Sequence, residues 1–79
     1  MPVRLDQLQP QVPAIVLAVD GQPEQVERLS AFGILPGQML QILRQAPWHG
    51  PLHLQVGGTE LLLRAAMAAC VSVKRCEPT

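Results

Sequence analysis

The distribution of apolar residues along the chain predicts short strands rather than a helical bundle. Between Ala14 and Val19 the chain is rich in aliphatic residues, and Asp20-Gly21 then supplies a turn signal. Apolar and polar positions alternate at Leu40–Ile42 and again at Leu52–Val56, which is the period of a strand with one solvated face. We therefore expect three strands in this part of the chain.

Two more strands are expected near the C-terminus. Gly57-Gly58 is typical of a hairpin turn, and the apolar run Leu61–Arg64 that follows it fits a fourth strand. The small apolar segment at residues 65–70 is too short for an independent helix and is interpreted as a turn or a single helical twist. The alternation at Val71–Val73 then predicts a fifth strand.

One helix is predicted between the first two of these strands. Pro23 suits a helix start, and Gly33 stands where a left-handed C-terminal cap would lie. Val26, Leu29 and Phe32 are three residues apart and form one apolar stripe. Because about ten residues of helix are marginal alone, this helix must pack on the sheet.

The segment RLSAFGILPGQML, residues 28–40, joins this helix to the next strand and is called the elbow below. Gly33 can end the helix by adopting a positive φ, and Pro36-Gly37 can turn the chain into the strand. Ile34 and Leu35 lie between these two signals and can fold back on the helix and the sheet. We expect Gly33, Pro36 and Gly37 to be structural residues that fix how the helix covers the sheet.

Length and composition predict one folded domain. The chain has 79 residues, 48% of them hydrophobic, so we expect a single domain over residues 1–79 with a core at about 5–74 and short tails. Several short strands in so small a chain avoid exposed edges best by curling. The predicted fold is mainly β: a small, partly open barrel of about five strands that carries one short helix.

Charge and hydropathy exclude several partner classes. Six Lys and Arg balance six Asp and Glu without a run of either sign, so a nucleic-acid partner is not expected. We find no apolar stretch of transmembrane length and no signal-peptide pattern, so we expect a cytoplasmic protein. With one Phe, one Trp and no Tyr, an aromatic groove for proline-rich ligands cannot be built.

The residues capable of metal chemistry or catalysis are few. His49, His53, Cys70 and Cys76 can be combined into a soft four-ligand site, but their spacing matches no established metal motif. Solvent-facing histidines and reduced thiols are the simpler interpretation, so we expect no metal and no cofactor. No triad, paired-carboxylate or phosphate-loop pattern occurs, and we expect no enzymatic activity.

Two motifs make the sequence similar to the FeoA family, small proteins associated with bacterial ferrous iron uptake. The family's helix-to-strand pattern R-L-x-x-hydrophobic-G-hydrophobic-x-P-G is filled in order by Arg28, Leu29, Phe32, Gly33, Ile34, Pro36 and Gly37. Its R-x-A-P loop and its later L-R pair are matched by Arg44, Ala46, Pro47, Gly50 and Pro51, and by Leu63-Arg64. The chain departs from the family pattern before the first strand, where it has Pro10-Gln11 in place of Pro-Gly.

This resemblance implies an SH3-like barrel and an accessory role in iron uptake. The partner that it implies is a FeoB-type membrane permease with a GTPase domain, bound at its cytosolic part to support assembly or activity. The alternative is a regulatory interaction module, since the same barrel resembles the C-terminal domain of iron-dependent repressors. A repressor would also need a helix-turn-helix, for which 79 residues leave no room.

The elbow and the loop around Trp48 are the candidate partner-binding surface. The residues assigned to it are Arg28, Leu29, Ile34, Leu35 and Trp48. Within this set Leu29 is expected to face the barrel, and Ile34 and Leu35 are not expected to be buried together. Trp48 is interpreted either as a lid on the open end of the barrel or as an exposed anchor for the partner.

Overall fold

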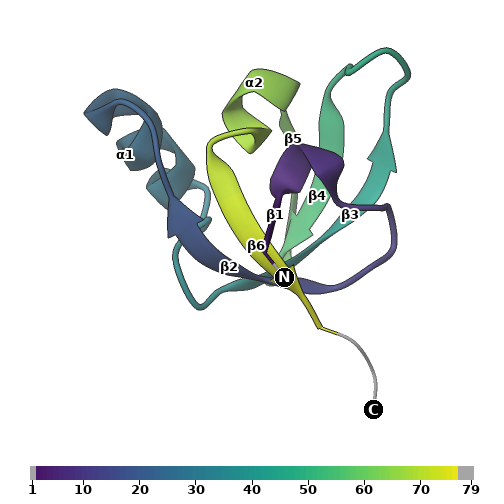
Figure 1. Cartoon of the computed structure of the whole chain (residues 1–79), viewed down its shortest axis with the longest axis horizontal. Coiled ribbons are helices and arrows are strands. Elements are labelled where there is room, and N and C mark those ends of the chain that lie inside the picture. Colours follow the sequence, from purple (N-terminus) through teal and green to yellow (C-terminus); the bar gives the residue numbers. More distant parts are fainter. Residues whose placement is uncertain (1, 77–79) are drawn as a thin grey trace.

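Six antiparallel strands, two short α-helices and one 3-10 helix occur in residues 2–76, the part of the chain described by the computed structural model (Figure 1). The strands are β1 (Val3–Arg4), β2 (Ala14–Val19), β3 (Met39–Gln45), β4 (Leu52–Val56), β5 (Thr59–Leu63) and β6 (Val71–Arg75). The helices are α1 (Pro23–Ala31), α2 (Ala65–Ala68) and the 3-10 helix η1 (Leu5–Gln7). None of the helices in residues 2–76 is long and apolar enough to cross a membrane.

The strands form one sheet in the order β1-β6-β2-β3-β4-β5. Figure 1 shows β2 and β6 on the left and the β3–β4 hairpin on the right, converging at the base of the view, so that the sheet curls around its inner face. The inner face and the two ends of the sheet supply one core, formed by Leu5, Leu8, Ala14, Val16, Leu29, Ile34, Leu40, Ile42, Leu52, Leu54, Val56, Leu63, Ala68, Val71 and Val73. No polar side chain is buried among the described residues, so the core is held together by apolar packing.

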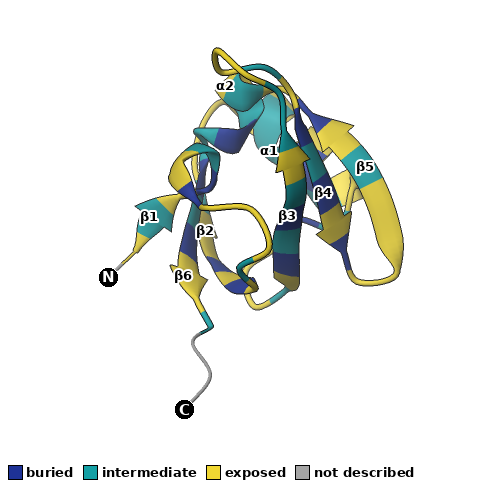
Figure 2. Cartoon of the chain, turned by 90° about the vertical axis from the view of Figure 1, so that its right-hand side faces the viewer, coloured by how far each residue is buried: buried dark blue, intermediate teal, exposed yellow. Residues whose placement is uncertain are grey.

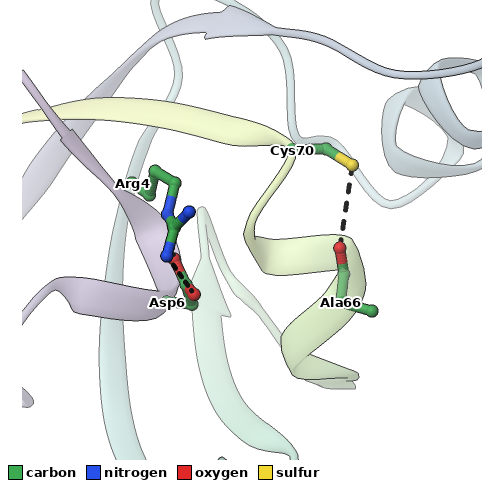
Figure 3. Close-up of polar contacts among 4 residues, drawn as sticks. All are labelled: Arg4, Asp6, Ala66 and Cys70. Atoms are coloured by element: carbon green, nitrogen blue, oxygen red, sulfur yellow. Dashed lines mark hydrogen bonds and ion pairs between the residues drawn. The ribbon is translucent and has the colours of Figure 1, made fainter.

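The five predicted strands and the predicted helix are all present, and a sixth strand was missed. β1 pairs with β6, and η1 follows it directly, with Leu5 and Leu8 fully or almost fully buried. A strand of two residues is too short to show alternation, which is why the sequence pattern did not reveal it. Within this segment, Arg4 on β1 is joined to Asp6 on η1, because Arg4 Nε donates to Asp6 Oδ1 at 3.1 Å (Figure 3).

Gln11 connects the N-terminal segment to the middle of the sheet. Its backbone N–H donates to Ile42 O at 2.7 Å, and its side-chain Nε2 donates to Leu43 O at 2.8 Å. These bonds lie where the β3–β4 register shifts between Ile42 and Arg44. Gln11 has a φ of 71°, a conformation that favours glycine, and it occupies the departure from the Pro-Gly pattern noted above. Its side-chain bond offsets part of that backbone cost.

The elbow begins with a Schellman motif at the C-terminus of α1. Gly33 has a φ of 88°, and its N–H donates to Ser30 O at 2.9 Å. The N–H of Ile34 donates to Leu29 O at 3.0 Å, and both of these side chains are completely buried. These two hydrogen bonds define the motif and satisfy carbonyl groups that the helix end would leave free.

A second turn completes the elbow. Gln38 N–H donates to Leu35 O at 3.0 Å, with Pro36 and Gly37 between them, and Gly37 has a φ of 91°. Proline followed by a residue of positive φ is the pattern of a type II turn. The turn is bonded to β2, because Gly37 N–H donates to Val16 O at 2.8 Å. Gly33 thus has the positive φ predicted for it, and Pro36-Gly37 forms a turn before β3 as predicted.

We expect Gly33→Ala to lower the free energy of unfolding by about 1–2 kcal/mol, the cost of holding an L-residue in the left-handed region. The loss comes from the backbone alone, because an added Cβ would lie 3.6 Å from Val56 Cγ1, an ordinary contact. The matched control is Gly58→Ala, where the φ is not left-handed and no atom lies within 4 Å of the new Cβ. Urea unfolding followed by circular dichroism measures both variants, and equal stabilities for the two would contradict the elbow geometry.

Candidate interaction surface

The structure divides the five residues assigned to a partner surface into two groups. Arg28, Leu35 and Trp48 are exposed. Leu29 and Ile34 have no exposed surface, so the assignment of these two residues to a contact surface is wrong. They form the buried side of the elbow, because the Schellman motif turns both side chains into the core. The expectation that Leu29 faces the barrel and that only one of Ile34 and Leu35 is buried is confirmed.

The elbow and Trp48 are separated by the length of β3. Leu35 precedes that strand and Trp48 follows it, and its seven residues span about 20 Å at the usual rise of a strand. Figure 1 shows the elbow and the β3–β4 turn at opposite ends of β3. The two features therefore do not form one continuous patch.

Exposed apolar side chains lie on the elbow and on the part of β2 beside it. Of the seven large hydrophobic residues exposed among the described residues, five lie there, and we call them the elbow patch: Ile15, Leu17, Phe32, Leu35 and Met39. Ile15 on β2 pairs directly with Met39 on β3. The hydrogen bond from Gly37 to Val16 holds the Pro36-Gly37 turn against β2 at the residue between Ile15 and Leu17. The sequence analysis missed the β2 residues because an unbroken apolar run does not show which side chains face outward.

Trp48 is at the tip of the β3–β4 hairpin and is 93% exposed, so it is not a lid on the barrel. Pro47 O accepts from Gly50 N–H at 3.2 Å, and the two residues between them, Trp48 and His49, have φ values of 56° and 58°. Two consecutive positive φ angles define a type I′ turn, which is usually made by Asn-Gly. The turn therefore holds two non-glycine residues in the left-handed region, at a cost in stability that is clearest for the bulky Trp48, and exposes the tryptophan to solvent.

We predict that replacing this pair by the residues that the turn prefers, Trp48→Asn with His49→Gly, raises the free energy of unfolding by about 1–2 kcal/mol. The control is Trp48→Ala, which leaves a non-glycine residue at the same positive φ and is expected to change stability little. Thermal unfolding followed by circular dichroism suits all three proteins, because the variants lack the only tryptophan. A double variant less stable than the parent would show that the turn is not strained.

The four residues considered for metal binding are distributed over separate elements. His49 is in the hairpin turn, whereas His53 Nε2 on β4 lies 2.9 Å from Glu60 Oε1 on β5. Cys70 follows α2 and its Sγ is 3.7 Å from Ala66 O, as Figure 3 shows, and Cys76 N–H donates to Pro13 O at 2.8 Å. Within residues 2–76 no three His, Cys, Asp or Glu side chains come together in a way that could hold a metal ion.

Comparison with protein-family models matches residues 3–75 to the FeoA domain. No curated protein matched the chain. Among solved structures, the crystal structure of an iron uptake regulatory protein (FeoA) is similar with a TM-score of 0.90 and 29% identity, covering 96% of this chain and 100% of that one.

Two further structures define the fold. The zinc complex of Stenotrophomonas maltophilia FeoA, described as a prokaryotic SH3 domain protein, has a TM-score of 0.76 and 28% identity over 89% of this chain and 87% of its own. A manganese-dependent transcriptional repressor has a TM-score of 0.87 at 14% identity, and the match covers 95% of this chain and 42% of the repressor. At that identity the repressor shows a shared fold alone. The mainly β, SH3-like architecture expected from the sequence is confirmed.

Proposed function

The chain belongs to the FeoA family, and we propose that it is an accessory protein of ferrous iron uptake that binds the cytosolic part of a FeoB-type membrane permease. The Stenotrophomonas maltophilia relative is described as a candidate ferrous iron transport activating factor. This description supports a role in which the chain acts by binding another protein. We propose further that the chain acts in the cytoplasm and contributes no catalytic residue, so that its effect comes from binding.

The elbow patch is the observation that carries this proposal. Five large apolar side chains exposed at one end of a small domain are typical of a protein–protein contact. The backbone beneath them is fixed by the two turns of the elbow and by the bonds between Gly37, Gln38 and Val16. Because this surface is already ordered, a partner would lose little conformational entropy by binding it.

Charges at the margin of the patch indicate the chemistry of the complementary face. Lys74 on β6 pairs directly with Ile15 on β2, and Arg28 is exposed in the last turn of α1. Both are cations, so we expect the permease to present an apolar face with carboxylates at its rim. Such rim charges act mainly on the association rate and on its dependence on salt.

Trp48 is proposed as a second contact of the same complex. An interface of standard size buries about 800 Å² on each partner and is about 30 Å across, which is wide enough to reach both ends of β3. Tryptophan is enriched at binding hot spots, and the cost of the turn that displays it favours a role in binding over a role in stability.

We predict that Leu35→Asp weakens binding to the isolated cytosolic domain of the permease by about tenfold or more, because it places an unpaired charge in an apolar contact. The control is Gln9→Asp, the same charge at an exposed position outside the elbow and the hairpin turn. Isothermal titration calorimetry with the domain in its nucleotide-free, GDP-bound and GTP-analogue-bound states measures all three proteins, with circular dichroism as the test of folding.

Trp48→Glu belongs in the same titration and is expected to weaken binding by about tenfold. If folded Leu35→Asp and Trp48→Glu both bind as tightly as the parent, the proposed surface is wrong. If the parent itself fails to bind in every nucleotide state, docking on the isolated cytosolic domain is excluded.

A further inference from the structure

Strand β5 is an open edge of the sheet. Among the described residues it pairs with β4 alone, at the end of the strand order opposite to β1. Figure 2 shows β5 at the right-hand margin of the molecule, with much of its surface exposed and no other element beyond it. The other edge, β1, has only two residues, whereas β5 has five and so offers a longer template for pairing.

The hairpin register identifies which backbone groups of β5 are free. Val56 and Thr59 flank the two-residue turn Gly57-Gly58 and form its closing pair, so hydrogen-bonded and non-bonded pairs alternate from there. Glu60 and Leu62 fall in the non-bonded pairs, opposite Gln55 and His53. Their N–H and C=O groups therefore face away from β4, toward the open edge.

Glu60 is the one charged side chain on β5, and the edge lacks the other features that usually prevent pairing with another strand. β5 contains no proline and no lysine, and its register with β4 runs without a shift from Thr59 to Leu63. Leu62, in the centre of the outer face, is 70% exposed. An exposed leucine on an unprotected edge is a site where a second strand is expected to add.

We propose that the occupant of this edge is a second copy of the chain, with the two β5 strands antiparallel about a two-fold axis at Leu62. The order of side chains is complementary to itself about that point. Glu60 and Arg64 are each two residues from Leu62, so Glu60 of one copy faces Arg64 of the other, twice. Leu62 faces Leu62 between the two ion pairs.

The surroundings of Glu60 and Arg64 leave both charges available. Arg64 is exposed and, with Leu62, lines a groove of about 530 Å³ that gives room to the side chains of the second copy. Glu60 Oε1 is already 2.9 Å from His53 Nε2, which leaves its second oxygen for the arginine. Arg64 O accepts from Met67 and Ala68, both at 3.0 Å, so the strand pairing ends there with about four backbone hydrogen bonds.

The test is sedimentation velocity of the whole chain over a wide concentration range. We expect a dimer that dissociates on dilution, and we expect Glu60→Arg and Arg64→Glu each to weaken it by about tenfold or more, because each variant converts both ion pairs into repulsive ones. Mixing the two variants in equal amounts should restore association, since the mixed pair has opposite charges at both positions. The double variant carrying both substitutions should also restore it.

If the double variant associates again, loss of the His53–Glu60 contact cannot explain the weaker association of Glu60→Arg, because that contact is also absent in the double variant. The inference is overturned if the parent remains monomeric at every concentration, if the single variants associate as well as the parent, or if neither the mixture nor the double variant recovers. The Glu60 and Arg64 variants leave the elbow patch unchanged, because none of Glu60, Leu62 and Arg64 belongs to it. The hairpin turn is shared, since the groove beside Leu62 and Arg64 is also lined by His49 and Gly50.

Discussion

The backbone hydrogen bond from Ile34 to Leu29 is the constraint on which the rest of the molecule depends. These two side chains are buried together at the end of α1, and the N–H of Ile34 closes the helix on the carbonyl of Leu29. Gly33 makes this closure possible because it takes a φ of 88° without a steric penalty. Once Ile34 is inside, the next residue must point outward, and the chain must turn within the following three residues to begin β3.

The exposed surface follows from this closure. Leu35 is the first residue of the type II turn, and the turn is bonded to β2 through Val16, so the outward faces of β2 and β3 meet beside it. The same side chains that cannot enter a core of this size thereby gather at one end of the domain. At the far end of β3 the chain reverses in a turn that costs stability and displays Trp48. The two ends of one strand thus carry the two most distinctive exposed features.

Much of this architecture could be predicted from the sequence, and the exceptions have physical causes. The strands at Leu52–Val56 and Val71–Val73 were found because each has one buried and one solvated face, and the elbow was found because Gly33 and Pro36-Gly37 specify backbone angles directly. The burial of Leu5 and Leu8 was missed, since tertiary packing rather than local periodicity places them in the core. The exposure of Trp48 was left open, because Trp48-His49 is not a sequence typical of the turn that it forms.

We propose that the elbow patch is buried when the protein binds a FeoB-type permease, and hydrogen–deuterium exchange tests this proposal most directly. Exchange would be measured by mass spectrometry for the chain alone and for the chain saturated with the permease's cytosolic domain, both at the same chain concentration so that self-association is held constant. The account predicts slower exchange in peptides covering β2, the elbow and the β3–β4 turn, with little change in α2. Unchanged exchange at the elbow in a complex shown to be saturated would contradict it.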